Sequence, residues 1–290
     1  MHDIINTLRI PQWLKQSFVA APLVFSGHLF CLHDAVITLI GIVVFCLLAS
    51  AIYIINDLAD RRFDRLHPQK RMRPIADGRI STARAVLLAT ALVMGTTLCL
   101  CVCAELRIGI PYLLTYLLLN TFYSLWGKRI PLWDVVIVAL CYVLRVVYGA
   151  ALISVEPSSW IILMSFLLAS VLALSKRRDD FVKWQQNQEM VRHGIQLYSL
   201  AFIDTVLSIL TSVTIICYVM YCMEEEVIQR LDSPNIYTTV VFVLVGMLRY
   251  LQLTIVQNAS VSPTRVLLTD RFLQVTVALW LLAFIYIIYA

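Results

Sequence analysis

Charged residues are scarce in this sequence. Lys, Arg, Asp and Glu make up 14% of its 290 residues, whereas hydrophobic residues make up 60% and the mean hydropathy is +0.82. A soluble domain would carry charge on roughly a quarter of its residues. The low charge therefore excludes an ordinary soluble domain, and recurring apolar stretches of about 20 residues indicate repeated crossings of a lipid bilayer.

Two other patterns are missing. Long runs such as AVITLIGIVVFCLLASAIYII (35–55) do not alternate polar and apolar residues, as the strands of a membrane barrel must. No two cysteines are spaced as CxxC, and nearly all eight lie in apolar stretches, so we interpret them as small hydrophobic residues. The sequence therefore predicts an all-α, polytopic membrane protein.

Nine transmembrane spans are predicted, and the basic residues predict their orientation. Of the 23 Lys and Arg, 19 fall on the side that holds the N-terminus, and two, Arg145 and Arg249, lie within spans. The N-terminus and the two longest loops, 56–82 and 175–198, are therefore expected to be cytoplasmic. We expect a single domain over residues 1–290. The predicted spans are 17–32, 35–55, 83–104, 108–126, 132–153, 158–174, 199–222, 236–257 and 272–290.

A dense block of mixed charge, NDLADRRFDRLHPQKRMRP (56–74), follows the second predicted span. Asp57, Asp60 and Asp64 would share one face if that helix continued past the bilayer edge, with Asn56 beside them. Carboxylates on one face repel one another unless a cation joins them, and oxygen ligands suit Mg²⁺, with Mn²⁺ as the alternative. These four residues are the predicted metal ligands, and the three aspartates are the predicted catalytic residues.

A basic cluster follows these acids directly. Lys70, Arg71 and Arg73 lie in a stretch that two prolines and a glycine keep out of a long helix. Guanidinium groups suit forked contacts with phosphate oxygens, so the block has what a diphosphate–Mg²⁺ complex requires. The alternative is a solvated helix end with salt bridges such as Asp57–Arg61, and spacing alone leaves it open.

The pattern NDxxDxxxD followed by HPxKRxRPIAxG resembles the UbiA superfamily of intramembrane prenyltransferases. The resemblance implies a nine-helix bundle that binds a diphosphate through Mg²⁺, with the two long loops forming the catalytic face. Most members carry a second motif, of DxxxD type, after the sixth helix. This sequence has SKRRDD (175–180) there, and the adjacent Asp179 and Asp180 would point about 100° apart on a helix. That departure counts against ordinary prenyl transfer.

One branch of the superfamily, the phosphoribosyltransferases that act on polyprenyl phosphate, is similar to this chain nearly end to end. The matching stretches are RIPQWLKQ, YSLWGKRIPLWDV, VLRVVYGA, SKRRDD and SPTRVLLTDRFLQ. The resemblance implies transfer of 5-phosphoribosyl from 5-phosphoribosyl-1-diphosphate to a polyprenyl (decaprenyl-type) phosphate in a bacterial cytoplasmic (inner) membrane. No nucleic-acid partner is expected, and a homo-oligomer is left open.

Such substrates carry further phosphates, which need more cations than one metal supplies. The predicted substrate contacts are Asn56, Lys70, Arg71, Arg73, Tyr123, Lys128, Arg145, Lys176 and Arg177. Arg145 lies inside an apolar span, where a charge usually faces the bundle interior with an anionic partner. Asp134 and the substrate itself are the candidates for that partner.

Two alternatives remain open. An enzyme that moves a prenyl group from its diphosphate to an aromatic or other small acceptor would share the first motif and the metal, but should carry the second acidic motif. A transporter would be compatible with buried charges such as Arg145. However, the sequence shows no inverted repeat or paired Gly/Pro-broken helices.

Overall fold

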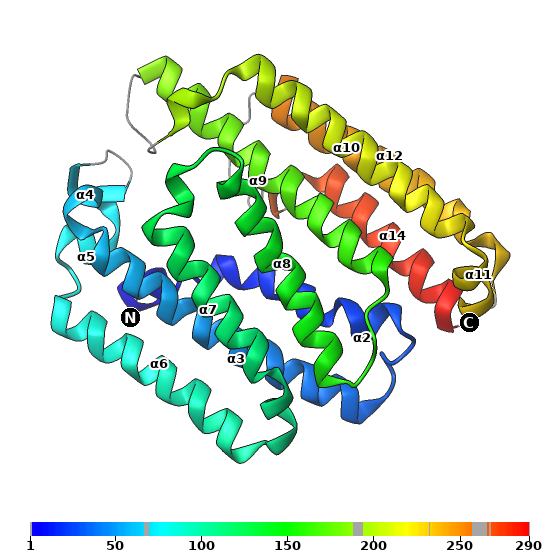
Figure 1. Cartoon of the computed structure of the whole chain (residues 1–290), viewed down its shortest axis with the longest axis horizontal. Helices are drawn as coiled ribbons and strands as arrows, with labels where there is room; N and C mark the ends of the chain where they lie inside the picture. Colours follow the sequence, from blue (N-terminus) through cyan, green and yellow to red (C-terminus); the bar gives the residue numbers. More distant parts are fainter. Residues whose placement is uncertain are drawn as a thin grey trace. The chain divides into compact units, whose positions relative to one another are not determined.

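The residues described by the computed structural model are helical and include no strand, so the all-α prediction is confirmed (Figure 1). The described residues are 2–66, 70–187, 194–231, 233–256, 266 and 268–289. Their contacts divide the chain into a first unit, Met1–Gly127 with Leu144–Glu156, and a second unit, Lys128–Val143 with Pro157–Ala290. The prediction of a single domain stays a prediction.

Eight helices among the described residues are long and apolar enough to cross a membrane. Each coincides with one of the predicted spans, and only the first predicted span, 17–32, has no counterpart among them. The eight are Leu32–Ala59, Thr82–Val102, Ala104–Leu125, Trp133–Leu152, Ser159–Gln186, Leu200–Met223, Pro234–Val256 and Arg271–Tyr289.

The first predicted span, 17–32, is not one long α-helix, because a 3₁₀ helix changes to an α-helix at Ala21 and this helix ends at Phe25. Residues Ile10–Ala20 form the 3₁₀ helix η1, and Ala21–Phe25 form the short helix α2. Pro11 and Pro22 each lie in the first turn of one of these helices, where a missing N–H is tolerated. Inside one long α-helix, a proline would remove a backbone hydrogen bond and clash with the preceding turn.

In the first unit, α3 (Leu32–Ala59) is the element on which most others pack. Its neighbours include α1 (His2–Leu8), η1 and α6 (Thr82–Val102). The further elements are α4 (Arg61–Leu66), η2 (Lys70–Met72), α5 (Pro74–Asp77), η3 (Ala104–Gly109), α7 (Ile110–Leu125) and the last part of α8 (Trp133–Leu152).

A small apolar cluster holds the charged block against α3 and α6. Its buried members are Ile54, Ile75, Ile80, Ala85 and Ala89. Pro74 begins α5, and Gly78, whose φ is 89°, ends it, so this one-turn helix is bounded by the residues that favour such ends. Because α5 is packed into the cluster, Arg73 immediately before it is held at the end of α3.

Gly149 of α8 allows η1 to approach this helix closely. A Cβ at Gly149 would collide with the backbone carbonyl of Val19, which is itself fully buried. We expect Gly149→Ala to lower the free energy of unfolding by about 2 kcal/mol, because the two backbones must move apart. Thermal unfolding of the purified protein in detergent measures this loss.

Gly95→Ala is the matched control for that substitution. A Cβ there would lie 3.6 Å from Leu47 Cδ1, which is an ordinary contact. Since alanine is also the better helix former, this variant should be at least as stable as the native protein. Equal melting temperatures for the two variants would show that the approach of η1 to Gly149 does not limit stability.

In the second unit, α9 (Ser159–Asn187) packs along α10 (Leu200–Met223), and α12 (Val240–Leu251) contacts α10 and α14 (Arg271–Tyr289) (Figure 1). Buried apolar side chains such as Leu174, Ile203 and Leu207 fill this bundle. The shorter elements of this part of the chain are η4 (Gly127–Arg129), η5 (Ile195–Leu197), α11 (Glu225–Leu231), η6 (Pro234–Thr239) and the π-helix η7 (Gln252–Val256).

The predicted loop 175–198 is helical over its first half, because α9 continues to Asn187. This extension carries Arg178, which is 5% exposed and contacts two other helices. Its Nε donates to Asp204 Oδ1 on α10 at 2.7 Å, and its Nη1 donates to the Thr254 carbonyl of η7 at 2.8 Å. Arg178 therefore joins α9, α10 and the helix formed by α12 and η7.

Candidate active site

The charged block after α3 forms an ion-pair cluster in the first unit. Asp57 and Asp64, here named the acidic pair, are both buried. Arg73 Nη1 lies 3.0 Å from Asp57 Oδ1 and 2.7 Å from Asp64 Oδ2. A second guanidinium comes from Arg9, whose Nη2 lies 2.5 Å from the same Asp57 oxygen. Burial makes such contacts stronger than surface ion pairs, since water screens them less.

The helix that carries the three aspartates is not continuous. α3 ends one residue before Asp60 and α4 begins one residue after it. Backbone hydrogen bonds nevertheless continue across the junction, from the Asp60 N–H to the Asn56 carbonyl at 2.9 Å and from the Asp64 N–H to the Asp60 carbonyl at 2.8 Å. Asp57 and Asp64 therefore keep a common side, while Asp60 occupies the junction itself.

The other predicted substrate-binding residues in and near the charged block differ in their exposure to solvent. Asn56 accepts a hydrogen bond from Ser124 Oγ of α7 at 3.0 Å, which joins α3 to α7. Tyr123, also on α7, is half-buried. On η2, Lys70 is half-buried and Arg71 is exposed. Arg73, the third predicted phosphate contact in the block, pairs with both members of the acidic pair.

Arg145 is buried in the part of α8 that belongs to the first unit. Its Nε donates to Gln16 Oε1 at 2.6 Å, and its Nη2 donates to the Tyr116 hydroxyl at 3.0 Å. The guanidinium also lies over two aromatic rings, 4.9 Å from the centroid of Tyr116 and 5.1 Å from that of Phe45. Amide, hydroxyl and ring contacts of this kind stabilise a buried guanidinium.

Asp134, a candidate from the sequence as partner for Arg145, forms an ion pair with Arg177. Asp134 Oδ2 lies 2.5 Å from Arg177 Nε, and both side chains are almost completely buried in the second unit. Arg177 Nη1 also lies 3.2 Å from Asp180 Oδ2 on its own helix. The pairing of Asp134 with Arg145 stays a prediction, and Asp180 acts as a second counter-charge for Arg177.

Tyr198 fixes the turn that leads into α8. Its hydroxyl donates to Asp134 Oδ1 at 2.9 Å and accepts the backbone N–H of Leu132 at 2.7 Å. Leu132 has a φ of 66°, an uncommon value for a residue other than glycine. Burial raises the pKa of Tyr198 to about 12, so its hydroxyl remains protonated near neutral pH and keeps both contacts.

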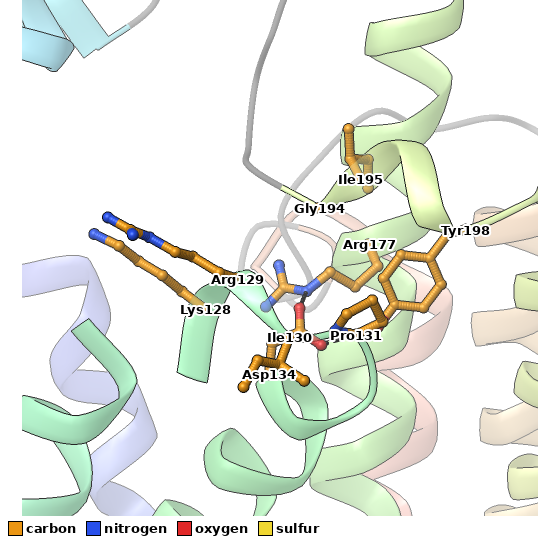
Figure 2. Close-up of a pocket in the computed structure, with 9 residues that line it drawn as sticks. All are labelled: Lys128, Arg129, Ile130, Pro131, Asp134, Arg177, Gly194, Ile195 and Tyr198. Atoms are coloured by element: carbon orange, nitrogen blue, oxygen red, sulfur yellow. Dashed lines mark hydrogen bonds and ion pairs between the residues drawn. The ribbon is translucent and has the colours of Figure 1, made fainter. Parts of the chain in front are cut away.

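Asp134, Arg177 and Tyr198 line a small pocket in the second unit (Figure 2). Arg177 faces Asp134 within it, whereas the side chains of Lys128 and Arg129 project away from that pair. Two predicted phosphate contacts, Lys128 and Arg177, thus line one pocket. Lys176, the neighbour of Arg177 on α9, is exposed.

The acidic pair has the donor chemistry that a hard divalent cation prefers. The two buried carboxylates converge on Arg73 Nη1. Asn56 and Asp60, which also carry side-chain oxygens, lie within three residues of Asp57 in the sequence. Within the described residues, no three His, Cys, Asp or Glu side chains are grouped as metal ligands. The residues therefore fit such a cation in chemistry, and the four-ligand metal site stays a prediction.

Sequence analysis missed Arg9 and Tyr198. Arg9 belongs to RIPQWLKQ, so its only signal was the similarity of that stretch to the phosphoribosyltransferase branch. For Tyr198 no local pattern gave a signal, because its partners Leu132 and Asp134 lie more than 60 residues away. His67 and Pro68, which complete the motif, lie outside the described residues.

Long apolar helices with buried carboxylates and guanidinium groups at their ends define a polytopic membrane protein with an ionic site. A model of the UbiA prenyltransferase family matches residues 17–265. The chain belongs to this family and is an integral membrane transferase of the UbiA superfamily, so the predicted family is confirmed.

The chain is also similar to named relatives over almost its whole length. Decaprenyl-phosphate phosphoribosyltransferase from Corynebacterium glutamicum is 27% identical over 299 residues, covering 99% of this chain and 86% of that protein. The protein of the same name from Mycolicibacterium smegmatis is 27% identical over 289 residues, covering 96% and 90%. The predicted similarity to this branch is confirmed.

A solved structure shares the fold. A UbiA homologue from Archaeoglobus fulgidus bound to GPP and Mg²⁺ matches with a TM-score of 0.69 and 20% identity, covering 99% of this chain and 100% of that one. At this identity the likeness concerns the fold alone, and it agrees with the helical bundle described above.

Proposed function

We propose that this protein transfers 5-phosphoribosyl from 5-phosphoribosyl-1-diphosphate to a polyprenyl (decaprenyl-type) phosphate and releases diphosphate. The observation that carries the proposal is the nearly full-length similarity to proteins named decaprenyl-phosphate phosphoribosyltransferase. Mg²⁺ is the proposed cofactor, with Mn²⁺ as the alternative, and the Mg²⁺ bound to the Archaeoglobus homologue supports this choice. The N-terminus and the catalytic loops would face the cytoplasm, as the basic residues predict.

The reaction breaks the bond between ribose C1 and a diphosphate oxygen and forms one between C1 and a phosphate oxygen of the lipid. Mg²⁺, when bound, would neutralise charge on the leaving diphosphate. Asp57, Asp60 and Asp64, with Asn56, would hold it. Arg73 already lies at the acidic pair and would bind diphosphate oxygens through its forked donors.

The attacking lipid phosphate needs no strong base, because a phosphate monoester is already anionic near neutral pH. What the protein must supply is orientation and positive charge around the reacting groups. The proposed contacts for the 5-phosphate of the sugar and for the lipid phosphate are Lys70, Arg71, Tyr123, Lys128, Arg145, Lys176 and Arg177.

The acids of α9 favour a sugar donor over a prenyl diphosphate. The carboxylates of Asp57 and Asp64 converge on a single Arg73 nitrogen. In contrast, Asp179 and Asp180 form ion pairs with two different basic side chains of their own helix. Asp179 Oδ2 lies 2.9 Å from Lys183 Nζ, and Asp180 pairs with Arg177 at 3.2 Å. The α9 acids thus lack the common meeting point that a second acidic motif would need to bind one metal.

The deciding experiment combines the purified protein with Mg²⁺, 5-phosphoribosyl-1-diphosphate and a polyprenyl phosphate, followed by mass analysis of the lipid. A product heavier by one phosphoribosyl group, absent when EDTA removes the metal, supports the proposal. A parallel reaction supplies a prenyl diphosphate and an aromatic acceptor. Turnover only in that second reaction would overturn the proposal in favour of prenyl transfer.

A further inference from the structure

Arg9 reaches the acidic pair from a segment outside the charged block. Its Nη2 lies 2.5 Å from Asp57 Oδ1, and its side chain is 26% exposed. The guanidinium also lies over the ring of Tyr53, 5.0 Å from the centroid. Asp57 therefore binds two guanidinium groups at one oxygen, Arg9 from the N-terminal segment and Arg73 from the loop before α5.

The backbone around Arg9 is tied to α3 on both sides. The Ser50 hydroxyl of α3, which is fully buried, donates to the Leu8 carbonyl at 3.0 Å and accepts the Trp13 indole N–H at 3.0 Å. Arg9 itself has left-handed backbone angles, with a φ of 55°. A residue other than glycine keeps this conformation only when its surroundings impose it, so the direction of the Arg9 side chain is built into the fold.

The charges of the acidic pair are balanced by those of Arg9 and Arg73. Two carboxylates face two guanidinium groups, and all four are joined by ion pairs of 2.5–3.0 Å. A divalent cation entering alone would meet two positive groups already bound to its ligands. The same cation entering with a diphosphate brings negative charge that both guanidinium groups can bind.

We propose that Arg9, together with Arg73, makes the acidic pair discriminate against a free divalent cation and in favour of a cation–diphosphate complex. Arg9 acts as a binding residue: it pairs with Asp57 before the complex enters and would then donate its hydrogen bonds to diphosphate oxygens. This inference rests on the proposed function only for the metal–diphosphate donor, and it holds equally for a sugar and a prenyl diphosphate.

The test measures binding of Mn²⁺ to the full-length protein in detergent, without either substrate. Electron paramagnetic resonance follows free Mn²⁺, and calorimetry follows the preformed Mn²⁺–diphosphate complex. Arg9→Gln should bind free Mn²⁺ about tenfold more tightly and the complex about tenfold more weakly, because a positive charge next to a divalent site is gone. Arg9→Lys keeps the charge and should retain most of the native preference.

Arg79→Gln is the matched control, since Arg79 pairs with Asp3 and Asp77 rather than with the acidic pair. It removes the same charge from an exposed position and should change neither affinity. Unchanged or weaker binding of free Mn²⁺ by folded Arg9→Gln would overturn the proposal. If that variant does not fold, the same measurement is made on Arg73→Gln. An unchanged affinity of Arg73→Gln for free Mn²⁺ would also overturn the proposal.

The outcome is independent of the donor assay. Failure to make a phosphoribosylated lipid would overturn the proposed function and leave the Mn²⁺ measurement standing. Conversely, a native Mn²⁺ preference in Arg9→Gln would remove the role of Arg9 without affecting the proposed reaction.

Discussion

Asp64→Asn is expected to lower turnover by about a thousandfold while the protein stays folded. Asp64 is buried and shares the Arg73 guanidinium with Asp57, and both carboxylates are proposed ligands of the metal. Asparagine keeps the shape and one oxygen, but it lacks the negative charge that holds a divalent cation. Initial rates at saturating Mg²⁺ and donor, together with the melting temperature, separate loss of chemistry from loss of fold.

Asp77→Asn is the control with the same change in charge. Asp77 lies three residues after the charged block, but its side chain is 47% exposed and pairs with Arg79 at 2.7 Å. Turnover close to native is expected for it. Asp60→Asn, at the junction of α3 and α4, should be as inactive as Asp64→Asn if it is also a ligand. Native-like rates for Asp64→Asn would contradict the metal assignment.

Asp134→Asn is expected to lower the free energy of unfolding by about 3 kcal/mol, near the lower end of what breaking a buried ion pair costs. The substitution removes one carboxylate from the buried Arg177 guanidinium, which keeps its ion pair with Asp180. Asparagine keeps an oxygen that can accept from Tyr198, so the change isolates the charge. Denaturant-induced unfolding in detergent gives the value.

Combining Asp134→Asn with Arg177→Met should restore most of this stability, because neither charge is then buried alone. The double variant also tests the proposed phosphate contact of Arg177. A stable double variant with strongly reduced turnover supports that role. A double variant as unstable as Asp134→Asn would show that the unpaired Arg177 charge is not the cause of the lost stability.

Much of the fold could be predicted because each long helix is a local pattern. Eight apolar runs are long enough to cross a bilayer, and each of them is a helix. The first predicted span, 17–32, differs from the others, because the 3₁₀ helix η1 changes within it to the short helix α2, which has Pro22 in its first turn. Where such a segment breaks depends on its packing against α3 and on Gly149, which composition does not report.

Only the part of the candidate site that lies along one helix could be predicted, because it follows from the spacing of its residues. Asp57 and Asp64 lie two turns apart, so their common side followed from their positions. The contacts that complete the site join residues distant in sequence. Arg9 and Asp57 are separated by 48 residues, and Asp134 and Arg177 by 43. Such pairs follow from how helices pack, and one sequence contains no periodic signal for them.

The contacts of Arg178 couple the local unfolding of three helices in the second unit. The carbonyls of Thr254 and Ile255 lie in the π-helix η7, and Arg178 donates a hydrogen bond to each of them. The same guanidinium neutralises Asp204 on α10. If any one of these helices opened at its contact with Arg178, the polar groups of the other helices would lose their partners. These groups are the buried guanidinium, the Asp204 carboxylate and the two carbonyls. Local opening of α9, α10 and the end of η7 is therefore coupled, and they behave as one cooperative unit.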